Sequence, residues 1–215
     1  EGGFAPNFES STEILDEIML SISEAGYAPG KNVSLALDVA SSEFYENNVY
    51  NIEGEKFNNI EMSDYLINLT QNYPILSIED GLGEDDWEGW KYLTEKLGEK
   101  IQLVGDDLFV TQEKILQKGI DDGCANSILV KVNQVGSVTE TIDTMKLAEK
   151  NNYSSLVSHR SGETEDTFIS HLCVGTSSGQ IKTGAPARSE RTAKYNELLR
   201  ICLLYTSPSP RDLVI

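Results

Sequence analysis

Six short apolar runs recur along the chain, and this repetition constrains the fold more than any other feature of the sequence. The runs are rich in Leu, Ile and Val and do not alternate cleanly with polar residues, which is typical of strands buried on both faces of a parallel sheet. They occupy residues 33–39, 75–79, 101–105, 127–132, 154–158 and 179–183. Helical patterns lie between them, so the spacing predicts repeated β-α units in an α/β fold.

Local signals indicate how several of these elements begin and end. Residues 12–25 predict a helix before the first strand, closed by Gly26. Thr111 is expected to cap one later helix, and Ser137 with Glu140 to form a capping box on another.

The segment after the first strand reads as an insertion into this regular pattern. Residues 43–54 predict a small hairpin that turns at Asn47 and Asn48. The insertion accounts for the longest gap between two successive apolar runs.

A residue able to do chemistry stands at or just past the end of each run. These residues are Asp38, Glu79, Asp106, Lys131, His159 and Lys182. Ligands and catalytic groups gather at the carboxyl ends of parallel strands, and an open sheet concentrates them at one switch point. Candidates at every strand end therefore favour a TIM-type barrel, with about six of its eight strands present. The absence of a G-x-G-x-x-G or Walker loop also weakens the case for a nucleotide-binding sheet.

The three acids precede the three bases along the chain. Asp38, Glu79 and Asp106 are hard oxygen ligands, which suit Mg²⁺. A single acid after a strand is more often a helix cap or a solvated turn residue, so the metal hypothesis depends on the recurrence. Lys131 is either an ordinary ion-paired lysine or, if burial lowers its pKa, a base.

The last two strand ends carry cations. His159 and Arg160, followed by Ser161, could hold a phosphate or carboxylate, or form an ordinary polar loop. Lys182 has the same two interpretations as Lys131. A metal beside a lysine base indicates removal of a proton next to a carboxylate, because only cations in a dry site stabilise the second negative charge that forms.

Charge and composition exclude some classes of partner. The net charge of -18 argues against nucleic acid as a partner. No apolar run reaches about 18 residues, so no membrane span is expected. The scattered Cys124, Cys173 and Cys202 fit neither a disulfide framework nor a zinc site, and we expect a cytoplasmic protein.

From Glu1 to Ile201 the sequence resembles the enolase (phosphopyruvate hydratase) family in the order and spacing of seven segments. These are EGGFAPN (1–7), LALDVASSEFY (35–45), SIEDGL (77–82), QLVGDDLFVT (102–111), ILVKVNQVGS (128–137), SHRSGETED (158–166) and GQIKTGAPARSERTAKYNELLRI (179–201). The resemblance implies that residues 1–201 form part of the C-terminal catalytic barrel of the enolase superfamily. It also implies a lyase of glycolysis and gluconeogenesis that reversibly dehydrates 2-phosphoglycerate, a phosphorylated hydroxy acid, to phosphoenolpyruvate.

The resemblance also implies roles for the residues that match the family's motifs. Asp38, Glu79 and Asp106 resemble the ligands of one Mg²⁺, and a second Mg²⁺ would arrive with the substrate. Lys131 resembles the base that takes the C2 proton, and Glu1 the acid that helps the C3 hydroxyl leave.

Further matches concern substrate binding. His159 resembles the family's histidine near the leaving group, and Lys182 the lysine that pairs with the substrate carboxylate. Arg160 and Ser161 resemble phosphate contacts. Glu79, Asp106 and Lys131 are expected to border the substrate as well.

The sequence departs from the family at both ends. Compared with the family, the N-terminal domain and the first barrel strands are missing, so we expect this polypeptide alone to be poorly folded and inactive. Full-length members of the family are commonly homodimers. Residues 202–215 do not resemble the family and contain two prolines that cannot extend a helix, which predicts a cloning or sequencing artefact.

Two other functions stay open on the sequence alone. The chain could be a non-catalytic fragment or binding protein that keeps the enolase fold. It could also be a barrel lyase that forms a Schiff base through Lys131 or Lys182. A superfamily member acting on a sugar acid is disfavoured, because SHRSGETED supplies a phosphate site.

Overall fold

The computed structural model describes residues 1–206, and the chain divides into two compact units. The larger unit comprises residues 6–155. The smaller unit comprises residues 1–5 together with the chain from residue 156 onward, which is described as far as residue 206.

A parallel sheet forms the centre of the larger unit. Its strands are β1 (Leu35–Asp38), β5 (Ile75–Glu79), β6 (Gln102–Gly105) and β7 (Ser127–Val130), paired in that order. Four of the six predicted apolar runs are thus confirmed as strands. Ile78, Leu103 and Ile128 are fully buried, as expected of a sheet covered by helices.

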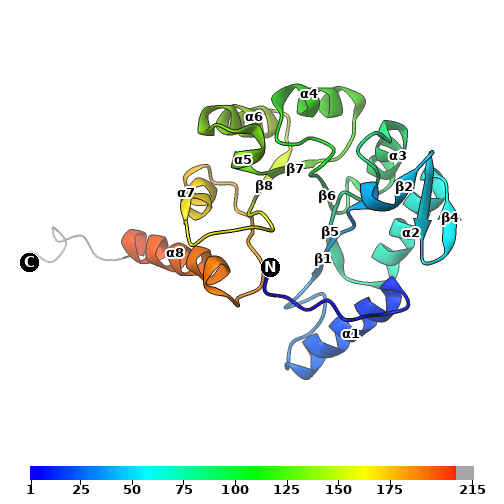
Figure 1. The fold of residues 1–215 in the computed structure, drawn as a ribbon, viewed down its shortest axis with the longest axis horizontal. Coiled ribbons are helices and arrows are strands. Elements are labelled where there is room, and N and C mark those ends of the chain that lie inside the picture. The colour runs from blue at the N-terminus through cyan, green and yellow to red at the C-terminus, as the bar shows by residue number, and fades with distance from the viewer. Residues whose placement is uncertain (207–215) are drawn as a thin grey trace, which may run out of the picture. The chain divides into compact units, whose positions relative to one another are not determined.

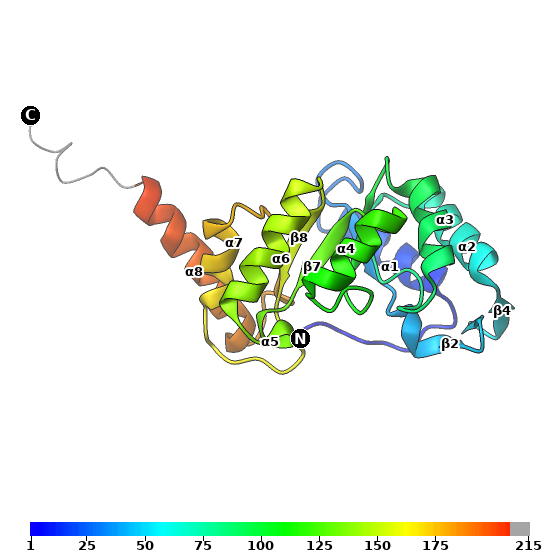
Figure 2. The ribbon, with the colours of Figure 1, turned by 90° about the horizontal axis from the view of Figure 1, so that it is seen from above.

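Helices alternate with these strands along the larger unit. They are α1 (Ser11–Glu24), α2 (Asn59–Asn72), α3 (Trp87–Leu97), α4 (Glu113–Asp122), α5 (Val132–Val135) and α6 (Val138–Lys150). Figures 1 and 2 both show α2 and α3 side by side. The stripe of Trp90, Leu93 and Leu97 on α3 is buried, because residues three and four apart share one face of a helix.

The helix ends agree with the sequence in part. The helix expected over 12–25 is α1, and Gly26 follows it at φ +84°. Thr111 does not cap α4, which begins after Gln112. Its buried hydroxyl instead accepts the N–H of Lys131 at 3.0 Å, so the cap prediction was wrong. At α6 the Ser137 hydroxyl accepts the N–H of Glu140 and caps the helix. The same hydroxyl donates to the Glu140 carboxylate, which thus bonds to the Ser137 side chain and not to its backbone.

The predicted hairpin is part of a three-stranded antiparallel meander. A short 3₁₀ helix, η1 (Ser41–Phe44), leads into β2 (Tyr45–Glu46), β3 (Val49–Ile52) and β4 (Glu55–Phe57). Asn47 and Asn48 form the expected turn with positive φ angles, as a two-residue type I′ connection requires. The strand β4 was not expected from the sequence.

The smaller unit continues the pattern of strand and helix. β8 (Ser154–Ser158), whose first two residues belong to the larger unit, pairs in parallel with β9 (Ile181–Lys182). Two helices, α7 (Phe168–Gly175) and α8 (Ser189–Thr206), pack against each other (Figure 1). All six predicted strands are therefore present, and the α/β fold of an incomplete TIM-type barrel is confirmed.

The tail predicted over residues 202–215 falls only partly on the described chain. Residues 202–206 continue α8, and residues 207–215 lie outside the described residues. Within residues 1–206 no helix combines the length and the apolar character that crossing a membrane requires.

Candidate active site

Strand register places two of the predicted acids side by side in the larger unit. Asp38 is the register partner of Glu79, and Glu79 is the partner of Val104. Asp106 follows β6 directly after its last residue, Gly105. Glu79 and Asp106 are buried, whereas Asp38 is exposed. The three acids thus stand at or just past the ends of three neighbouring strands, and the register pairs Asp38 with Glu79.

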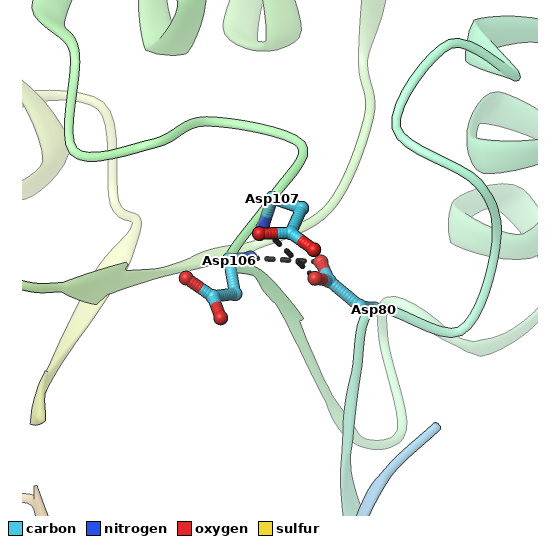
Figure 3. Close-up of side chains that lie close together, drawn as sticks. All are labelled: Asp80, Asp106 and Asp107. Carbon is cyan, nitrogen blue, oxygen red and sulfur yellow. Dashed lines mark hydrogen bonds between the residues drawn. The ribbon is translucent and has the colours of Figure 1, made fainter. Parts of the chain in front are cut away.

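A fourth acid, Asp80, holds the turn that carries Asp106. One Asp80 carboxylate oxygen accepts the N–H of Asp106 and the other accepts the N–H of Asp107, both at 2.8 Å (Figure 3). The Asp80 backbone has φ +43°, a left-handed conformation that Asp tolerates better than most residues. Burial raises the pKa of Asp80 to about 7, although both backbone hydrogen bonds favour its charged form.

Two sets of acids at the carboxyl ends of these strands could bind a cation. The carboxylates of Asp80, Asp106 and Asp107 lie within 4.8 Å of one another. Figure 3 shows, however, that the Asp106 carboxylate points away from Asp80, whose oxygens both face backbone N–H groups. The clamp on the backbone explains the position of Asp80, and Asp106 follows the strand next to the two that end in Asp38 and Glu79. Three hard carboxylates from neighbouring strand ends fit Mg²⁺.

Lys131 lies directly beside one of these acids. Its Nζ is 2.5 Å from Asp106 Oδ2, and the two side chains are 16% and 12% exposed. The Lys131 N–H donates to the buried Thr111 hydroxyl, which fixes the backbone at the end of β7. Lys131 thus forms an ion pair with Asp106, which places its amine next to this acid.

In the smaller unit, His159 and Glu1 approach each other. His159 Nε2 lies 3.7 Å from Glu1 Oε1, and the histidine is buried while the glutamate is half exposed. Burial lowers the pKa of His159, and the cations Arg191 and Lys182 lower it further, whereas Glu1 and Glu163 act in the opposite direction.

Close backbone packing fixes Glu1 beside the chain that follows β9. Its carbonyl accepts the N–H of Ala185 at 3.1 Å. Gly184 has φ +82°, and a Cβ at this position would lie 2.8 Å from the Glu1 carbonyl oxygen. Only glycine allows this approach without strain.

The remaining predicted residues line the loop after β8 and the end of β9. Ser158 is the register partner of Lys182, and the His159 N–H donates to the Lys182 carbonyl at 2.9 Å. Arg160 is half-buried and Ser161 is exposed. The nine predicted site residues in the two units thus form two groups. The group in the larger unit is Asp38, Glu79, Asp106 and Lys131. The group in the smaller unit is Glu1, His159, Arg160, Ser161 and Lys182.

Two cations that the sequence analysis did not single out support this loop from α8. Arg191 and Lys194 are each only 1% exposed. Arg191 bonds to the imidazole of His159 and to the carbonyls of Arg160 and Ser161. Lys194 Nζ pairs with Glu163 at 2.8 Å and also donates to the carbonyl of Thr164. Their spacing of three residues places both on one helix face, but nothing in the sequence shows which loop that face meets.

The chain matches one family model, described as Enolase, C-terminal TIM barrel domain, over residues 1–205. The match includes every residue that the sequence analysis assigned to the site. It also includes Asp80, Arg191 and Lys194, which the structure adds.

Proposed function

The chain belongs to the family of enolase C-terminal TIM barrel domains, and we propose that it carries residues for the reversible, Mg²⁺-dependent dehydration of 2-phosphoglycerate to phosphoenolpyruvate. This reaction would make it a lyase of glycolysis and gluconeogenesis. The observation that carries the proposal is the Lys131 amine 2.5 Å from Asp106, together with the pairing of Asp38 and Glu79 at the ends of β1 and β5.

Asp38, Glu79 and Asp106 would hold Mg²⁺. Their support is the pairing of Asp38 with Glu79, the position of Asp106 just past β6, and the preference of Mg²⁺ for carboxylate oxygens. When bound, Mg²⁺ would supply positive charge for the substrate carboxylate, which gains a second negative charge as the reaction proceeds. A second Mg²⁺ is proposed to accompany the substrate.

The protein's own residues would move two protons. Lys131, in its neutral form, would take the proton from C2, and the electron pair of that bond would move into the carboxylate. Glu1 would then donate a proton to the C3 hydroxyl, which leaves as water while the C2–C3 double bond forms. The reverse sequence hydrates the product, so Lys131 and Glu1 exchange their roles of base and acid.

The other residues would bind and orient the substrate. Lys182 would pair with the substrate carboxylate, and Arg160 with Ser161 would contact the phosphate. His159, buried beside Glu1, would face the leaving hydroxyl. We further propose a cytoplasmic protein that is a homodimer when full length and that binds neither nucleic acid nor membranes.

The proposal is tested by following formation of the enol product from 2-phosphoglycerate by ultraviolet absorbance. The 215-residue chain alone is expected to be inactive, so turnover is measured in the chimera described below, where it should require Mg²⁺ and stop with EDTA. Lys131→Met should remove essentially all turnover, because loss of a general base costs about 10²–10⁴-fold or more. Lys118→Met, which changes an exposed ion pair on α4, is the matched control and should leave the rate unchanged.

A chimera tests whether these residues support catalysis, independently of how the isolated chain behaves. Residues 1–201 replace the matching segment in an active member of the family, and the chimera is assayed in the same way. A chimera that is folded and binds Mg²⁺ but does not turn over would refute the proposal. That result would favour the alternative of a non-catalytic protein with the enolase fold.

A further inference from the structure

The side chain of Arg191 reaches from α8 to the imidazole of His159. Its Nη1 lies 2.6 Å from His159 Nδ1 and 2.8 Å from the Arg160 carbonyl, and its Nη2 lies 2.7 Å from the Ser161 carbonyl. Arg191 is 1% exposed and His159 is 3% exposed, so water does not compete for these bonds.

The chemistry of the two side chains decides which one donates. A guanidinium carries only donors, so His159 Nδ1 must be the acceptor and carries no proton. A neutral imidazole then has its single proton on Nε2. We propose that Arg191 is a positioning residue that fixes His159 as the neutral Nε2–H tautomer.

This assignment determines what His159 can offer to a ligand. Its Nε2 is buried, lies 3.7 Å from Glu1 Oε1 and has no hydrogen-bond partner within residues 1–206. The ring therefore presents an N–H donor beside Glu1. Building on the proposed function, His159 would donate to the leaving C3 oxygen as a neutral imidazole and not as an imidazolium.

The surroundings of the ring disfavour its charged form. Protonation of Nδ1 would place a second N–H against the Arg191 guanidinium, and Lys182 adds another positive charge nearby. Glu1 and Glu163 are the opposing negative charges around the ring. The bonds from Arg191 to two backbone carbonyls hold its guanidinium in place, so it does not swing away when the ring titrates.

The test is a ¹⁵N NMR measurement of the histidine side chains in the 215-residue chain. The chain contains only His159 and His171, and His171→Gln assigns the two sets of signals. His159 should show a protonated Nε2 and an unprotonated Nδ1 across about pH 6 to 8, a range centred near the ordinary pKa of histidine. His171 is half exposed beside Glu197 and gives the second set of signals in the same spectra.

Variants of Arg191 then identify the cause of the tautomer. In Arg191→Met the donor that faces Nδ1 is lost, so the Nδ1–H tautomer should appear and the pKa of His159 should rise. Arg191→Lys keeps one donor and should restore the Nε2–H form. Lys194→Met removes an equally buried cation that holds the same loop without touching His159, and it should leave the tautomer unchanged.

Two results would overturn the inference. One is a His159 that carries its proton on Nδ1, or a mixture of tautomers, in the unaltered chain. The other is an Arg191→Met variant whose His159 signals match those of the unaltered chain. Neither measurement needs turnover, so a chain with the Nε2–H tautomer but no activity would contradict the proposed reaction and leave this inference standing.

Discussion

Three buried ionisable side chains hold backbone beside the candidate residues of the two units. Asp80 accepts two backbone N–H groups, Arg191 donates to two carbonyls, and Lys194 donates to the carbonyls of Glu190 and Thr164. Charged groups make stronger hydrogen bonds than neutral ones, and here these bonds immobilise the turns that carry Asp106 and His159. Single residues away from the reacting atoms thus set the positions of residues proposed to touch the substrate.

The carboxyl of Asp80 should leave a signature in the dependence of stability on pH. Its pKa is raised from 3.8 to about 7 in the folded chain, so between these values the folded state holds a proton that the unfolded state has lost. The contribution of Asp80 to the free energy of unfolding is fully present below about pH 4 and is lost as the pH rises to about 7. Urea unfolding should therefore show the unaltered chain losing stability relative to the non-titrating Asp80→Asn over this range.

The same substitution should weaken the proposed metal site. An Asn amide offers one acceptor, so one of the two N–H groups of Asp106 and Asp107 loses its partner. Mg²⁺ affinity, measured by calorimetry, should fall by about 10- to 100-fold, the range typical when support of a ligand residue is removed. Asp143→Asn, at an exposed ion pair on α6, is the control, and equal Mg²⁺ binding by Asp80→Asn and the control would contradict the clamp.

Gly184 offers a test of how tightly Glu1 is fixed. Gly184→Ala combines an unfavourable φ of +82° with a Cβ 2.8 Å from the Glu1 carbonyl, whereas Gly26→Ala has a similar φ of +84° and open space. The left-handed conformation alone costs about 1–2 kcal/mol. The free energy of unfolding should fall further in Gly184→Ala than in Gly26→Ala. Equal losses would show that Glu1 is not packed against this glycine.

Among the elements, the meander after β1 is tied to the start of α3 by one tyrosine. Tyr50 on β3 is fully buried, and its hydroxyl donates to Asp86 at 2.6 Å and accepts the N–H of Gly83 at 3.0 Å. Asp86 in turn caps α3 through the N–H of Gly89. This connection fixes the inserted strands to a regular β-α unit.

Loss of this hydroxyl should destabilise the chain. Tyr50→Phe leaves buried groups of Asp86 and Gly83 without a partner, which costs about 1–3 kcal/mol. Tyr92→Phe removes an exposed hydroxyl that bonds to Asp64 at 3.3 Å and should change the free energy of unfolding by less than about 0.5 kcal/mol. Similar urea midpoints for both variants would argue against the role given to Tyr50.

The elements differ in how clearly the sequence predicts them. The α3 helix has a strong apolar stripe and the six strands have continuous apolar runs, so both were predictable. The α2 helix was passed over, although Asn58 and Glu61 form a complete capping box at its start. Thr111 was misassigned because a threonine before a helix has the same sequence signature whether it caps the helix or bonds to the end of a neighbouring strand.

For the whole molecule, the net charge of -18 sets a general sensitivity to salt. Repulsion among like charges favours the expanded chain, and about 0.1 M salt screens it beyond about 10 Å. The urea midpoint should rise between about 0.01 M and about 0.15 M NaCl. A midpoint that falls would show that attractive ion pairs such as that of Lys131 with Asp106 outweigh the general repulsion.

The site was predictable where it follows from strand ends and not where it depends on packing between distant elements. Asp38, Glu79 and Asp106 could be singled out because each stands at or just past the end of an apolar run, and the register of β1 and β5 pairs the first two. Arg191 lies 32 residues beyond its partner His159, and no local pattern links a helix face to a particular loop. Their pairing becomes visible only when the helix has been placed against the loop.

The pairing of Asp38 with Glu79 has a consequence for folding. Side chains alternate between sheet faces, so a slip of one residue between β1 and β5 would turn one of these carboxylates to the opposite face. An ion held by both carboxylates stabilises only the arrangement that presents both of them. Mg²⁺ would therefore favour the native register of the sheet over misaligned registers. The ion proposed for catalysis would thus also favour correct assembly of the barrel.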